Sequence, residues 1–146
     1  MEVEIIEKPL RLELYGFSGP AFNKDYAGTA YKLSAKVWEA VKLNGIRNKG
    51  RNIWIYDKND ILFAGIETEE VEGKYSPLEH KIILTDKYAY YKHIGSYSLI
   101  KQAGLNMIKE IKLKGLETSF PSIEIYGHWN KDESRLETEI IINLGK

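Results

Sequence analysis

The hydrophobic positions along the chain follow two different periods, and together they predict an α+β fold. Apolar residues recur every three or four positions in two segments, which predicts helices over residues 30–44 and 98–114. A glycine follows each segment, Gly45 or Gly115, as is typical where a helix ends. Short segments rich in Ile and Tyr lie between turn-forming residues and predict strands over 3–7, 10–17, 52–56, 61–67, 81–85, 88–93, 122–126 and 137–144.

The order of these elements occurs twice along the chain: strand, strand, helix, strand, strand. Residues 53–56 (Ile-Trp-Ile-Tyr) match residues 123–126 (Ile-Glu-Ile-Tyr) at an offset of 70 positions. The first half contains additional residues near 22–28, between its strand and its helix. Half-domains of this size are too small to bury separate cores, so we predict a single domain. Its parts would be a first repeat over 1–67, a linker over 68–77 and a second repeat over 78–146.

The matched strands predict a binding groove. Side chains alternate between the two faces of a strand, so Trp54 shares a face with Tyr56, and Glu124 shares a face with Tyr126. We expect the other face of these strands to pack on the helices; it carries Ile53, Ile55, Ile123 and Ile125. If the repeats meet about a pseudo-twofold axis, the polar and aromatic faces enclose a groove with one carboxylate. Aromatic rings and an unpartnered carboxylate both favour an organic cation.

Two simpler interpretations of the same residues stay open at this point. A glutamate between two isoleucines is often a solvent-facing residue on a half-exposed sheet. Trp and Tyr in strands are often packing residues, and the chain is rich in aromatic side chains, with ten Tyr, four Phe and three Trp.

Charge and composition exclude several classes of protein. The 21 basic and 21 acidic residues give a net charge of zero, so we expect no direct nucleic-acid binding. The absence of cysteine excludes a disulfide scaffold, a thiolate metal site and a cysteine nucleophile. The acidic start differs from a signal peptide, and no apolar run reaches the ~20 residues of a membrane span. We expect a soluble, cytoplasmic protein. The oligomeric state stays open, a homodimer across a sheet edge included.

The second half carries a resemblance to a known family. His93-Ile94-Gly95-Ser96-Tyr97, a helix, and then Glu124-Ile125-Tyr126 resemble the GyrI-like small-molecule-binding superfamily. This superfamily includes the effector-binding domains of AraC-type and MerR-type bacterial transcription activators. The resemblance implies a tandem repeat with two helices on one face of a curved antiparallel sheet and a ligand cleft between the repeats. Residues 1–9 are too few for a helix-turn-helix module, so we expect no operator binding.

The resemblance also implies roles for individual residues. Glu124 matches the glutamate that meets lipophilic cations in multidrug-binding members. The aromatic residues that would stack on a ligand are Trp54, Tyr56 and Tyr126, followed by Phe17, Tyr90, Tyr97 and Trp38. Other members resemble hydrolases that open strained cyclopropane-type electrophiles with the same glutamate, and others modulate DNA gyrase. The predicted function is therefore binding of a lipophilic or aromatic cation. A hydrolase, or a gyrase-modulating or toxin-antagonising interaction protein, stays open as an alternative.

The remaining candidate residues have simpler explanations. The histidines lack the spacing of metal ligands, and we expect neither a metal nor another cofactor. His93 is predicted to cap the junction between a strand and a helix, with a catalytic pairing to Glu124 as the alternative. Gly104 interrupts the second helix and predicts close packing there, with room for a ligand as the alternative.

Overall fold

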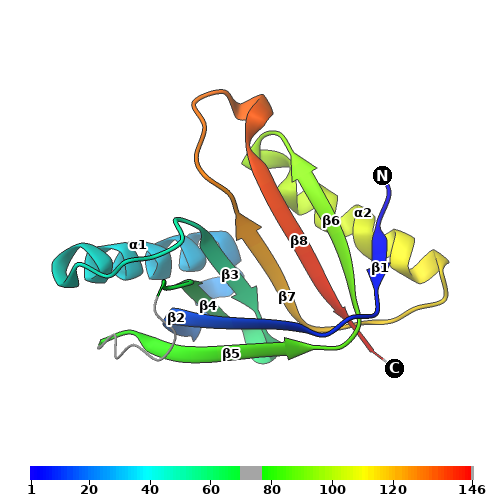
Figure 1. Cartoon of the computed structure of the whole chain (residues 1–146). Helices are drawn as coiled ribbons and strands as arrows, with labels where there is room; N and C mark the ends of the chain where they lie inside the picture. Colours follow the sequence, from blue (N-terminus) through cyan, green and yellow to red (C-terminus); the bar gives the residue numbers. More distant parts are fainter. Residues whose placement is uncertain (70–76, 146) are drawn as a thin grey trace.

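The strands and helices follow the predicted order in a computed structural model that describes residues 1–69 and 77–145 (Figure 1). The strands are β1 (Glu4–Ile6), β2 (Leu10–Pro20), β3 (Asn52–Tyr56), β4 (Ile61–Ile66), β5 (Glu79–Thr85), β6 (Tyr88–Ile94), β7 (Thr118–Tyr126) and β8 (Glu137–Leu144). The helices are α1 (Tyr26–Asn44) and α2 (Ile100–Leu113), with short 3-10 turns η1 (Phe22–Lys24), η2 (Lys58–Asp60), η3 (Tyr97–Leu99) and η4 (Glu133–Arg135). Most of the predicted linker lies outside the described residues.

The eight strands of the described residues join one antiparallel sheet in the order β1-β6-β8-β7-β3-β4-β2-β5. The order is symmetric about the central β7–β3 pair, so each strand of one half has a counterpart in the other. The outermost strands exchange halves: β1 pairs with β6, and β5 pairs with β2. The two halves are therefore joined at three places in the sheet.

The helices begin and end where local capping chemistry permits. Helix α1 starts before the predicted residue 30 because the Asp25 side chain caps it, accepting a hydrogen bond from the Gly28 amide at 3.0 Å. It ends at Gly45, whose left-handed φ of 58° suits a residue without a Cβ. Neither helix has an apolar stretch long enough for a membrane crossing in the described parts of the chain.

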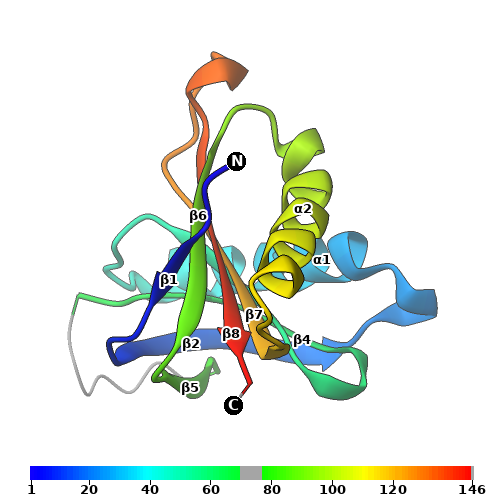
Figure 2. The ribbon, with the colours of Figure 1, turned by 90° about the vertical axis from the view of Figure 1, so that its right-hand side faces the viewer.

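Both helices cover the same face of the sheet (Figure 2). Helix α1 packs over the buried residues Tyr15 and Ile66, and α2 packs over Ile140 and Ile142. Directly opposed residues share a face, and the register connects these two regions through the pairs Ile140–Glu124, Glu124–Trp54 and Trp54–Ala64. Glu124 and Trp54 therefore lie on the helix side, between the two helices.

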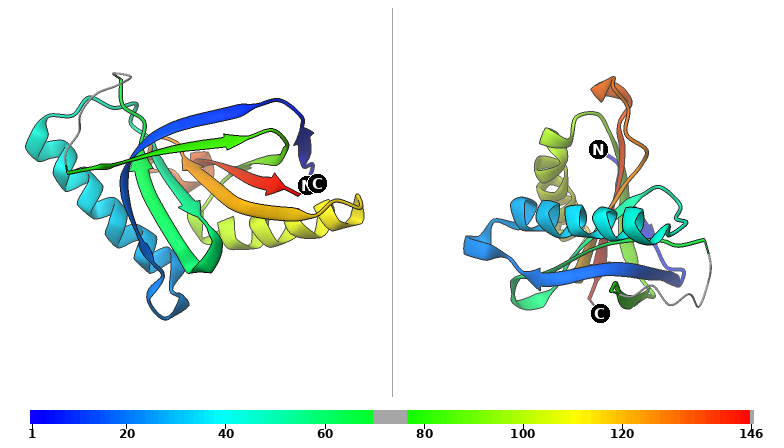
Figure 3. Two further views of the ribbon diagram at one scale, coloured as in Figure 1. Left: turned by 90° about the horizontal axis from the view of Figure 1, so that it is seen from below. Right: turned by 90° about the vertical axis from the view of Figure 1, so that its left-hand side faces the viewer.

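The isoleucines of β3 and β7 face away from the helices, so the prediction that they pack on the helices is wrong. They are buried in a separate core with side chains of β2 and β5; its members include Ile53, Ile55, Ile123, Ile125, Leu12, Leu14 and Ile83. The sheet bends around this interior, with the helices on the outside (Figure 3). Side chains of β2 and β5 cover the isoleucines inside the bend. The opposite face of β3 and β7, which carries Trp54 and Glu124, therefore lies beneath the helices.

Candidate functional site

The central β3–β7 pair places the matched residues of the two halves directly opposite each other. Trp54 opposes Glu124, and these are the two positions related by the offset of 70 residues. The axis that relates the halves therefore passes between them. Tyr56 and Tyr126 lie two residues further along their strands, on the same face.

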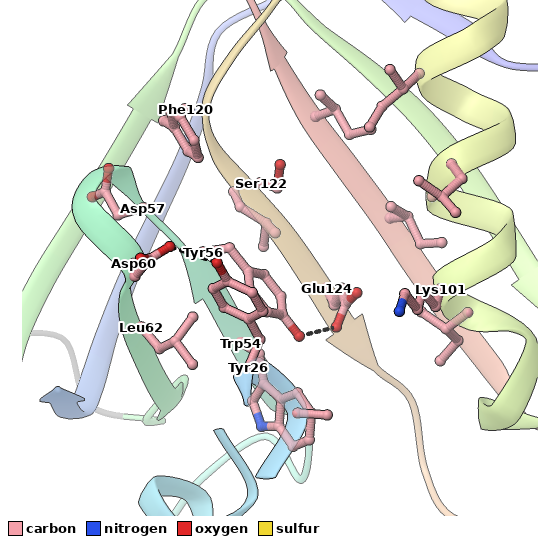
Figure 4. A pocket seen from close by; sticks show the side chains of 18 of the residues that line it. Tyr26, Trp54, Tyr56, Asp57, Asp60, Leu62, Lys101, Phe120, Ser122 and Glu124 are labelled. Atoms are coloured by element: carbon pink, nitrogen blue, oxygen red, sulfur yellow. Dashed lines mark hydrogen bonds between the residues drawn. The ribbon is translucent and has the colours of Figure 1, made fainter. Parts of the chain in front are cut away.

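A pocket of about 690 Å³ lies over these residues (Figure 4). Strands β3 and β7 supply Trp54, Tyr56 and Glu124, while the start of α1 and one side of α2 supply further walls. The lining also includes the apolar side chains Leu62, Ile100, Leu105, Ile108, Phe120, Ile140 and Ile142. The walls of the cavity are thus mainly apolar and aromatic, as is typical of a small-molecule pocket. Its polar and charged lining residues are Lys24, Asp25, Asp57, Asn59, Asp60, Lys101, Ser122 and Glu124.

Glu124 is held by two tyrosine hydroxyls. Tyr126 Oη donates to Glu124 Oε1 at 2.6 Å, and Tyr56 Oη donates to the same oxygen at 2.7 Å. Within the described residues, the other carboxylate oxygen accepts no hydrogen bond and no cationic side chain pairs with Glu124. The carboxylate is therefore oriented by neutral donors and has no counter-charge there.

Burial dominates the electrostatics of this group. Burial raises the pKa of Glu124 above its usual value, although the hydroxyls of Tyr126 and Tyr56 act in the opposite direction. Burial, and then the charge of Glu124, raise the pKa values of Tyr56 and Tyr126, which keeps both hydroxyls protonated as donors. The glutamate is thus placed where either a proton or a bound cation would stabilise it.

Three aromatic rings pack in sequence beside the carboxylate. The Trp54 and Tyr126 ring centroids are 4.8 Å apart at an interplanar angle of 59°. Tyr97, from η3, meets Tyr126 edge-on with centroids 5.3 Å apart. Such tilted and edge-to-face pairs are favourable arrangements, and they fix the rings as a wall of the pocket.

The sequence interpretation missed the side chains that line the pocket from the turn between β3 and β4 and from the start of α1. Tyr26 Oη donates to Asp60 Oδ1 at 2.5 Å, which links α1 to this turn. Asp57 lines the pocket from the same turn, and Lys101 does so from α2. Tyr26 belongs to the additional residues near 22–28 that distinguish the first half from the second. That insertion was the available signal.

The structure brings together five of the eight predicted site residues, which line the pocket: Glu124, Trp54, Tyr56, Tyr97 and Tyr126. The other three predicted residues do not line the pocket. Phe17 and Trp38 pack against the core beneath α1. Tyr90 packs against the core on the opposite face of the sheet, where its hydroxyl donates to Glu139 at 2.6 Å.

Two further expectations concern residues near the second helix. His93 is buried at the end of β6, and its Nε2 lies 3.0 Å from the carbonyl oxygen of Ser96. The ring therefore links the end of the strand to the turn that precedes α2, as expected of a residue that caps this junction. The prediction of close packing at Gly104 is wrong: a Cβ there would meet no atom within 4 Å, and the residue borders the pocket. No group of three or more potential metal ligands occurs in residues 1–69 and 77–145.

Comparison with solved structures places this architecture among known folds. The C-terminal domain of EcmrR superposes with a TM-score of 0.71 at 18% identity, over 100% of this chain and 99% of that one. SAV2435 bound to tetraphenylphosphonium gives a TM-score of 0.66 at 16% identity, over 99% and 94% of the two chains. A hydrolase from Listeria innocua gives 0.56 at 13% identity, over 99% and 92%.

These likenesses define the fold. The chain has the GyrI-like fold, which confirms the resemblance drawn from its sequence. No protein-family model matches the sequence, and no curated protein matches it either.

Proposed function

We propose that this protein binds a lipophilic or aromatic organic cation in the pocket between α1 and α2, with Glu124 as the counter-charge. One observation carries the proposal: Glu124 is largely buried among aromatic rings, yet no cationic side chain pairs with it in the described residues. An unpaired buried carboxylate is costly, and a ligand cation would remove that cost.

The chemistry of the walls favours an organic cation over a metal ion. Metal ions need several oxygen or nitrogen ligands, whereas the walls around Glu124 are mainly apolar and aromatic. Each ring face attracts a desolvated organic cation by about 0.5–2 kcal/mol. The GyrI-like protein SAV2435 was solved with tetraphenylphosphonium, a cation of this kind, which supports the same ligand class here.

Titration with tetraphenylphosphonium tests the proposal, because Trp54 lines the pocket and its fluorescence should respond to a ligand. We expect saturable binding, weakened roughly tenfold to a hundredfold in Glu124→Gln, which keeps the shape of the side chain and removes its charge. Glu137→Gln is the matched control, since this carboxylate pairs with Lys92 outside the pocket. Equal binding by wild type and Glu124→Gln would contradict the proposal.

Hydrolysis of a strained electrophile is the second candidate function. It is favoured by the raised pKa of Glu124 and by its carboxylate oxygen Oε2, which accepts no hydrogen bond in the described residues. Such a carboxylate can take a proton from water as the water oxygen bonds to a strained ring carbon. The ring C–C bond at that carbon then breaks, and Glu124 returns the proton to the carbon that leaves with the electron pair. Mass spectrometry after incubation with cyclopropane-type electrophiles should then show hydrated product in molar excess over the protein, and none with Glu124→Gln. Product that never exceeds the protein would argue against turnover.

A further inference from the structure

Lys101 gives the α2 side of the pocket a solvent-exposed positive group. It lies in the first turn of α2 and lines the same pocket as Glu124, with its amine turned toward that carboxylate in Figure 4. The two side chains form no ion pair, and within the described residues Lys101 has no other charged partner. Glu124 and Lys101 thus face each other across the pocket as opposite charges, and neither is neutralised by a protein side chain that the structure describes. The other charged lining residues lie on the side of α1 and of the β3–β4 turn: Lys24, Asp25, Asp57 and Asp60.

The position of Lys101 strengthens the positive potential on this side of the pocket. The N-terminal end of a helix carries the positive end of its dipole, and acidic residues are favoured there. The first turn of α2 contains none, and Leu99 at the cap position supplies no side-chain hydrogen bond. A lysine at this place adds its charge to the dipole instead of offsetting it.

We propose that the pocket is selective for zwitterionic ligands, with the cationic part against Glu124 and the tyrosines and an anionic group, such as a carboxylate, paired with Lys101. This inference rests on the proposed role of Glu124. A simple cation is attracted by Glu124 but repelled by Lys101, whereas a zwitterion neutralises both groups. The lysine ammonium is a compact, strongly hydrated charge on a flexible stem, so it can follow an anionic substituent at the pocket wall.

Two ligands of nearly the same shape test this selectivity. Tetraphenylphosphonium carries one positive charge, and (4-carboxyphenyl)triphenylphosphonium adds one carboxylate to the same skeleton. Calorimetric titration at constant ionic strength should show that the wild-type protein binds the carboxylated compound roughly threefold to tenfold more tightly. In Lys101→Met, the parent cation should gain affinity and the carboxylated compound should lose roughly tenfold, so that the preference reverses.

The control and the outcomes separate this inference from the proposed function. Lys109→Met removes the same charge from an exposed position of α2 outside the pocket lining and should leave both affinities unchanged. If tetraphenylphosphonium binds but Lys101→Met shifts both ligands equally or not at all, the role of Lys101 is overturned and the cation pocket stands. If neither ligand binds the wild-type protein, both proposals fail together.

Discussion

At the scale of single residues, Glu124 combines two opposing influences. Burial disfavours its charged form, and the hydroxyls of Tyr56 and Tyr126 favour that form by donating to it. Burial prevails, so the pKa of Glu124 is raised. A proton and an organic cation would stabilise the same group in the same pocket, and they should therefore compete.

This competition predicts a pH dependence of ligand affinity. The affinity for tetraphenylphosphonium should fall as the pH is lowered through the raised pKa of Glu124, and the decrease should approach about tenfold per pH unit. Fluorescence titrations from about pH 8 down to about pH 4, just below the ordinary pKa of a glutamate, would measure it. In Glu124→Gln the weak residual affinity should not change over this range, and a parallel decrease in the variant would assign the effect to another group.

The raised pKa of Glu124 also predicts how the free energy of unfolding depends on pH. Because the folded-state pKa of Glu124 is raised, the folded protein binds more protons than the unfolded chain between the two pKa values. The contribution of Glu124 to the free energy of unfolding is therefore highest below the unfolded-state pKa and is lost as the pH rises through the folded-state pKa. Urea denaturation should show the ligand-free wild type losing stability relative to Glu124→Gln over that interval. If the wild type instead gained stability relative to Glu124→Gln as the pH rose, burial would not be what determines the pKa of Glu124.

At the scale of elements, α2 is both a structural helix and a wall of the pocket. Met107 and Ile111 are fully buried against the sheet, while Gly104 and Leu105 border the pocket. A glycine in a helix interior is unfavourable relative to alanine. Gly104 therefore lowers the stability of the helix, and its missing side chain leaves open space in the pocket.

Two substitutions of Gly104 should separate stability from binding. Gly104→Ala should raise the free energy of unfolding by about 0.5–1 kcal/mol, because the new Cβ meets no atom and the helix propensity improves. Gly104→Leu should keep that stability but weaken tetraphenylphosphonium binding about tenfold or more, because the longer side chain occupies the pocket. Denaturation and titration of both variants measure the two effects. Unchanged binding in a folded Gly104→Leu would place the ligand elsewhere.

The strands show what local pattern can and cannot predict. Alternation along β3 and β7 correctly grouped Trp54 with Tyr56 and Glu124 with Tyr126 on one face, because side-chain period is a property of a single strand. It could not decide which face the helices cover, since that depends on the bend of the whole sheet. Tyr90 shows the same limit: its face became known only when the register of β6 against β8 was known.

At the scale of the whole molecule, the repeat in the sequence predicted the order of the elements but not the exchange of the outer strands. Nothing in the short segments of β1 and β5 shows which neighbour each will pair with, because strand pairing is a non-local choice. Their exchange means that β1 completes the sheet of the second half, where Val3 joins the core beneath α2. Similarly, the insertion near 22–28 was visible as extra length, but its role in lining the pocket through Tyr26 was not.

The exchanged strands and the shared β3–β7 ladder predict that the two halves unfold together. Met107 is fully buried in the second half, and Met107→Ala should lower the free energy of unfolding by about 2–5 kcal/mol. The free energy of opening can be measured at the slowest-exchanging amides of each strand. If unfolding is cooperative, it should fall by the same amount in β4, in the first half, as in β8. Amide hydrogen exchange followed by mass spectrometry would compare them, with the exposed Leu113→Ala as a control that shifts neither. Protection lost in β8 but kept in β4 would mean that each half is stable alone, and the pocket between them would then depend on the docking of two independent units.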